Sequence, residues 1–161
     1  PMKRCIMTIM PAVKQLESKL DRCLCHGGFY EFGCAGTEHL GTRQASIQAD
    51  YPRFQPVGFR EDGTWDYRGA HPRETEQEAR DRGERIAQWI WDFAEGWLAE
   101  EERCAPPRTL ILSMHQTIVD LVAQILVEGT SAGWQYGEIK NRLQNTGMTE
   151  IFLENGSARF G

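Results

Sequence analysis

The run TLILSMHQTIVDLVAQIL, at residues 109–126, limits the possible folds of this chain more than any other segment. Its first six residues form a short apolar stretch preceded by two prolines, which is typical of a buried parallel strand. Its last ten residues repeat apolar side chains at helical spacing, and Gly129 is suited to end that helix. A strand that leads into a helix predicts an α/β layered domain.

Two more helices are predicted before this run. Residues 2–20 carry apolar side chains at intervals of three and four, although Pro11 would kink the helix or mark a restart. Within residues 73–103, Thr75 and Glu78 fit a capping box, and an apolar stripe that includes the tryptophans follows them. We expect those tryptophans to belong to the core.

The remaining segments are shorter or irregular. Residues 23–73 are rich in glycine and proline, which predicts turns and loops, with a short helix at residues 42–51. Such a long loop region in a compact domain is usually functional. The tail predicts a strand, a turn at Asn155 and Gly156, and a second strand. The length of 161 residues suits a single domain spanning 1–161.

Composition narrows the class of protein. The formal net charge is −5, without long runs of like charge, so a nucleic-acid partner is not expected. No apolar stretch reaches the roughly 18 residues that span a bilayer, and the start has no signal-peptide pattern. The five cysteines are an odd number without the spacing of a disulfide framework, which predicts reduced thiols and a cytoplasmic location.

His115 lies between the predicted strand and the helix that follows it. Ligands bind at this edge of open α/β sheets, and the first backbone N–H groups of a helix favour an anion. A histidine here can act as a nucleophile, as an acid or as a hydrogen-bond donor to phosphate. The alternative is a structural histidine bound to a backbone carbonyl.

The order of four motifs resembles the histidine phosphatase superfamily, which is also called phosphoglycerate mutase-like. PMKRCIMTI at residues 1–9 is similar to the family pattern Ser-Pro-Leu-x-Arg-x-x-x-Thr-Ala at Pro1, Arg4 and Thr8. The capped helix follows, then His115 after its apolar run, and then Asn-Thr-Gly-x-Thr at residues 145–149. These motifs extend over nearly the whole chain.

The resemblance implies a three-layer α/β/α sheet and phosphomonoester hydrolysis of a phosphorylated small molecule, without metal or organic cofactor. In that family a first histidine, within Arg-His-Gly, accepts the phosphoryl group. Arg4 matches an arginine that binds the phosphate oxygens, and His115 matches the second histidine. Cationic donors around the equatorial oxygens are what phosphoryl transfer requires.

Two departures from the family pattern are visible. Arg-His-Gly does not occur in the 161 residues, so we expect the domain to be partial and to lack its first strand. The family's carboxylic acid before Gly-Gly-x-Tyr matches Cys25, and a thiol is a poor acid in that role. Glu31 is close in sequence and is the candidate replacement.

Three alternatives remain open. The chain could be a non-catalytic member of the same fold that binds phosphate or a partner. His26 could be a nucleophile, since His26-Gly27-Gly28 resembles part of an Arg-His-Gly loop. A zinc site is the third alternative, and its candidate ligands are Cys23, Cys25, His26, Cys34 and His39. They lack paired Cys-x-x-Cys knuckles, so no metal site is expected.

Overall fold

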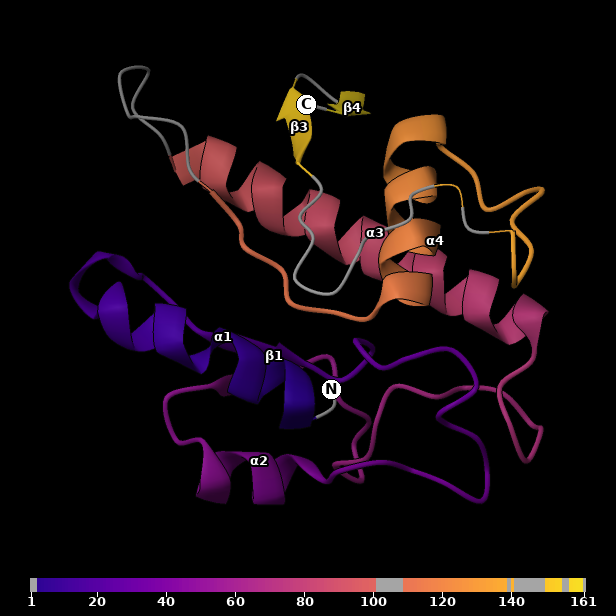
Figure 1. Cartoon of the computed structure of the whole chain (residues 1–161), viewed down its shortest axis with the longest axis horizontal. Helices are drawn as coiled ribbons and strands as arrows, with labels where there is room; N and C mark the ends of the chain where they lie inside the picture. Colours follow the sequence, from indigo (N-terminus) through magenta and orange to yellow (C-terminus); the bar gives the residue numbers. More distant parts are fainter. Residues whose placement is uncertain (1–2, 101–108, 139, 141–149, 155–156, 161) are drawn as a thin grey trace.

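The computed structural model describes residues 3–100, 109–138, 140, 150–154 and 157–160. Helices and short strands alternate through this part of the chain, which confirms a mixed α/β fold (Figure 1). The elements are α1 (Lys3–Gln15), the 3-10 helix η1 (Glu17–Lys19), β1 (Leu24–His26), α2 (Gln44–Asp50), β2 (Gln55–Val57), α3 (Glu76–Glu100), α4 (Gln116–Glu128), β3 (Ile151–Glu154) and β4 (Ser157–Phe160).

Helix α1 packs with α2 and strand β1 around one apolar cluster, and β2 pairs with β1 in parallel. The periodicity of residues 2–20 is confirmed over α1, because Ile6 and Val13 are buried on one face of this helix. Pro11 lies inside the helix on its exposed side and does not end it. The helix predicted at residues 42–51 is also confirmed as α2, whose Ile47 belongs to the same cluster.

Helices α3 and α4 cross and form the main core of the domain (Figure 1). The capping box at the start of α3 is confirmed. The backbone N–H of Thr75 donates to Glu78 Oε2 at 2.9 Å, and the N–H of Glu78 donates to Thr75 Oγ1 at 3.3 Å. Gly129 ends α4 in the left-handed conformation, with φ of 74°, as the sequence predicts.

The strand predicted at residues 109–114 is wrong. This segment is extended but pairs with no strand among the described residues, although Leu110, Leu112 and Met114 pack on the α3–α4 core. Ile111 points away and is 58% exposed. The apolar alternation therefore sets which side is buried, but a strand also needs a hydrogen-bonding neighbour, and the described part of the chain provides none here.

The sheets that are described have two strands each. Strand β1 pairs with β2 in parallel, and β3 pairs with β4 in antiparallel fashion. The second pair confirms the two strands predicted for the tail, while Asn155 and Gly156 lie outside the described residues. In the described part of the chain, no helix is both long and apolar enough to cross a membrane.

Candidate functional site

Arg4 and His115 lie in contact, although 111 positions separate them in the sequence. Arg4 is in the first turn of α1, and His115 is the N-cap residue of α4. The arginine Nη2 lies 3.1 Å from His115 Nδ1, and its Nε lies 3.3 Å from the same nitrogen. The structure therefore brings together the two residues that the resemblance assigns to phosphate binding.

The position of His115 follows from the run of residues 109–114. This segment meets the first turn of α1, where the Ser113 hydroxyl donates to the Cys5 carbonyl at 3.2 Å. In Figure 1 this orange stretch passes between α3 and α1 before it enters α4. The His115 side chain makes no capping hydrogen bond to α4, so its imidazole is available for contacts with α1.

The surroundings of His115 keep its imidazole neutral. Burial, followed by the positive charge of Arg4, lowers its pKa from 6.5 to about 4. At neutral pH the ring is therefore a hydrogen-bonding group and carries no charge, while Arg4 remains cationic. Because arginine only donates, the contact requires an unprotonated Nδ1 on the histidine.

The amino terminus of α4 lies beside this pair. The first backbone hydrogen bond of the helix runs from the N–H of Val119 to the carbonyl of His115, at 2.9 Å. The N–H groups of residues 116–118 precede that bond, and such groups at a helix start favour an anion. A guanidinium, a neutral imidazole and the start of a helix together form a cradle suited to an oxyanion.

Glu31, the candidate acid, is near this cradle but is not in it. Its carboxylate accepts the N–H of Phe32 at 2.8 Å, and no hydrogen bond links it to Arg4 or His115 in the described part of the chain. Burial raises the pKa of Cys34, and the Glu31 charge raises it further, whereas Arg4 lowers it. Glu31 and Arg4 therefore act on the same thiol, and the acid role of Glu31 stays a prediction.

Cys25, at the position of the family acid, is a packing residue. Its side chain is buried in the cluster of α1 and α2, where Ile6 and Phe54 are neighbours in the same apolar group. Burial raises the pKa of this thiol to about 11. A thiol with this pKa in an apolar cluster is a weak proton donor to a leaving group.

His26 has a structural role, and its surroundings do not suit a nucleophile. Its Nδ1 accepts the N–H of Gly28 at 3.0 Å, and its ring lies 4.7 Å from Phe29 and 4.6 Å from Trp89. Burial lowers its pKa to about 4. A Cβ at Gly58 would lie 2.4 Å from His26 Nε2, so the backbone also closes over the ring.

A buried ion pair, which the sequence did not reveal, fastens the loop that carries Glu31. Arg82 Nε and Nη2 donate to the two oxygens of Glu74, each at 2.7 Å, and both side chains are almost completely buried. Arg82 Nη1 also donates to the carbonyls of Gly28 and Tyr30, at 2.8 and 3.0 Å. The sequence does contain one sign that Arg82 is buried, because it lies between Ala79 and Ile86 on the core face of α3.

The small cavity beside that ion pair is separate from the Arg4–His115 contact. It measures about 60 Å³ and is lined by polar side chains that include Tyr30, Tyr67 and Glu78. Ligand pockets usually measure about 300–1,000 Å³, so this space suits a few water molecules. Neither Arg4 nor His115 lines it.

The zinc alternative finds no support in the described residues, where no three His, Cys, Asp or Glu side chains are placed to hold a metal ion. Cys104 and the predicted motif at residues 145–149 lie outside the described part of the chain. Comparisons with protein-family models, with curated proteins and with solved structures found no match.

Proposed function

We propose that this chain binds the phosphoryl group of a phosphorylated small molecule, as part of a phosphomonoester phosphatase of the histidine phosphatase type. The observation that carries the proposal is the contact of Arg4 with His115 at the start of α4. Arg4 would supply a permanent charge and a planar fork of donors to the phosphate oxygens. His115 would supply a neutral donor, and the α4 backbone would add N–H groups.

The three-layer α/β/α sheet is part of the same proposal, and residues 109–114 support it. They are partly buried, and the backbone groups of residues 110–114 make no hydrogen bond to the backbone of any described residue, although the Met114 carbonyl accepts the Cys5 thiol at 3.6 Å. Buried backbone groups are nearly always paired, so this edge is suited to another strand. A strand that carries Arg-His-Gly would add here, with its histidine near Arg4 and His115.

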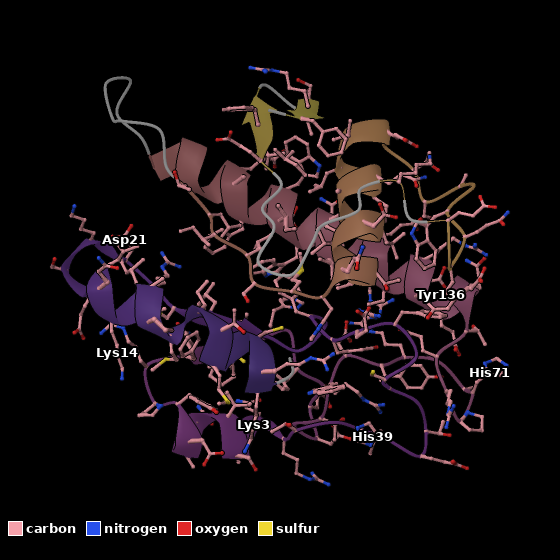
Figure 2. All side chains as sticks on the ribbon, viewed as in Figure 1. Lys3, Lys14, Asp21, His39, His71 and Tyr136 are labelled. Carbon is pink, nitrogen blue, oxygen red and sulfur yellow. The ribbon has the colours of Figure 1, made fainter. Side chains whose placement is uncertain are left out.

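Hydrolysis would need that additional histidine. Of the four histidines in the chain, His26 is enclosed by aromatic rings and His115 is occupied in the cradle. His39 and His71 are both exposed, and His71 lies at the right-hand margin of the molecule in Figure 2. We therefore expect these 161 residues to bind phosphate and to leave phosphomonoesters intact.

A non-catalytic member of the same fold is the second candidate. The observation in its favour is Cys25, which replaces the expected acid and is buried among apolar side chains. A protein of this kind would bind a phosphorylated molecule through Arg4 and His115 and release it unchanged. Adding a segment that carries Arg-His-Gly to this chain would produce phosphatase activity if the protein is a phosphatase, and none if it is a non-catalytic binding protein.

Calorimetric titration with inorganic phosphate at neutral pH tests the binding proposal. Arg4→Ala removes a charge and a fork of donors, so we expect affinity to fall at least tenfold, which corresponds to about 1.4 kcal/mol. Lys3→Ala is the matched control. It removes the same charge one residue away, but Lys3 pairs with Asp50 of α2 and lies on the surface (Figure 2).

Equal phosphate affinities for Arg4→Ala and Lys3→Ala would show that only the net charge of the protein matters. That result would rule out a specific phosphate site at Arg4 and His115. A chain that binds no phosphate, although it is folded, would contradict both candidate functions.

A further inference from the structure

The direct contact between Arg4 and His115 uses the same groups that would bind phosphate. The Nε–H of Arg4 donates to Nδ1 of His115 at 3.3 Å, and Nη2 of Arg4 lies 3.1 Å from the same nitrogen. Two such neighbouring donors are the fork with which arginine binds a phosphate group in bidentate fashion. Nδ1 accepts in this contact, so it has no proton to donate to an oxyanion. In the ligand-free protein the imidazole therefore takes the place of a phosphate oxygen.

The spacing of the two side chains leads to the same conclusion. An oxygen that accepts from two nitrogens at about 2.8 Å each holds those nitrogens about 4.5–5.5 Å apart. The nitrogens of Arg4 and His115 are closer than this, at 3.1 and 3.3 Å. A phosphate oxygen can therefore be shared by the two side chains only after their contact has opened.

Arg4 is the partner that can move. It lies in the first turn of α1 and is exposed, and its Nη1 makes no hydrogen bond to any residue that the structure describes. His115 is buried, and the Cys5 sulfur lies against its ring, 3.2 Å from Nε2 and 3.9 Å from Nδ1. The imidazole is thus enclosed beside α1, whereas the long arginine side chain can change rotamer toward solvent.

A phosphate dianion competes well with the imidazole for the donors of Arg4. Burial, followed by the charge of Arg4, lowers the pKa of His115, so the ring is a neutral acceptor at neutral pH. A dianion adds the attraction between opposite charges, which a neutral ring does not offer. Once the fork has left Nδ1, this nitrogen can carry a proton and donate to the same anion.

We propose that the Arg4–His115 contact is the closed state of the phosphate site and that phosphate opens it by exchange: the Arg4 fork moves from Nδ1 to the phosphate oxygens, and Nδ1 changes from acceptor to donor. The inference rests on the proposed function, because the exchange requires that phosphate binds here. The site is then occupied by its own imidazole until an oxyanion displaces it. Molecules without an anionic group do not open it.

Nitrogen-15 NMR of the histidine rings and of Arg4, at pH 7.5, tests the exchange in two steps. In phosphate-free buffer, His115 should show a bare Nδ1 and a protonated Nε2. At saturating inorganic phosphate, Nδ1 should become protonated, and the Arg4 Nε–H signal should shift because its acceptor has changed. His26 is the internal control, since its Nδ1 accepts the Gly28 N–H at 3.0 Å and should stay bare in both steps. Lys3→Ala should behave as the wild type.

A protonated Nδ1 of His115 in the phosphate-free protein would overturn the proposal, whether or not phosphate binds. An Nδ1 that stays bare at saturation would also overturn it, because phosphate would then bind the outer Nη1 edge of Arg4, and the proposed function would stand. Protonation of the His26 Nδ1 in the same titration would show a general rearrangement and would overturn the exchange. A folded chain that binds no phosphate would contradict the proposed function, and the exchange with it.

Discussion

Acid should destabilise this fold well above the pH at which carboxylates are protonated, because two buried histidines are neutral in the folded state. Burial lowers the pKa values of His26 and His115 from 6.5 to about 4. The unfolded chain therefore binds protons at a higher pH than the folded chain does. The stabilisation is complete above pH 6.5 and is lost progressively as the pH falls from 6.5 through about 4.

The magnitude follows from that difference. One pKa unit corresponds to 1.36 kcal/mol, so the shift from 6.5 to about 4 makes each histidine worth about 3 kcal/mol. His26 is 7% exposed and His115 is 8% exposed, so solvent screens neither strongly. The two contributions together are comparable to the free energy of unfolding of an ordinary domain, which is about 5–15 kcal/mol.

Urea unfolding followed by tryptophan fluorescence at pH values from 7.5 to 4.5 measures this loss. The free energy of unfolding should fall as the pH drops below about 6.5, with a slope approaching about 1.4 kcal/mol per pH unit for each histidine. His26→Gln and His115→Gln should each remove one share of that slope. His39→Gln, on the exposed loop, is the control and should leave the slope unchanged. A free energy of unfolding that is constant down to pH 5 would show that the two histidines do not govern the acid stability of the fold.

Three further predictions follow from the same structure. Arg82→Ala leaves the Glu74 carboxylate buried without its partner, so the free energy of unfolding, measured with urea, should fall by about 3–5 kcal/mol. Lys3→Ala, which breaks an exposed ion pair, is the control and should change that free energy by less than about 1 kcal/mol. Gly58→Ala should lower the melting temperature, because φ is 61° and the new Cβ would meet the His26 ring. An unchanged melting temperature of Gly58→Ala in calorimetry would contradict this prediction. The 161-residue chain should release no phosphate from an aryl phosphate, and turnover that His26→Ala abolishes would make His26 the nucleophile after all.

The helices could be predicted because their signals are local. Apolar spacing in α1, the Thr75–Glu78 box of α3 and Gly129 after α4 each depend on residues within one or two turns. Residues 109–114 could not be settled in the same way. Alternation identifies their buried side, but strand pairing depends on whether a partner segment lies alongside, which a local pattern does not contain.

The site was predictable only in part. The resemblance assigns Arg4 and His115 to one phosphate pocket, and the structure places the two side chains in contact, while their role stays a proposal. The positions of Cys5 and Arg82 depend on which segments meet in three dimensions. A cysteine in a helix and an arginine on an apolar stripe have many possible environments, and only the packing of α1 against residues 113–115 selects the one observed for Cys5.

A phosphate titration at pH 7, followed through the ring signals of all four histidines, shows whether phosphate binds at Arg4 and His115. The histidines lie in different surroundings, so each reports on its own part of the molecule. We expect a saturable shift of the His115 signals that is lost in Arg4→Ala and kept in Lys3→Ala, while the His26 and His39 signals stay in place. Saturable phosphate binding that leaves the His115 signals unmoved would show that the oxyanion site lies elsewhere.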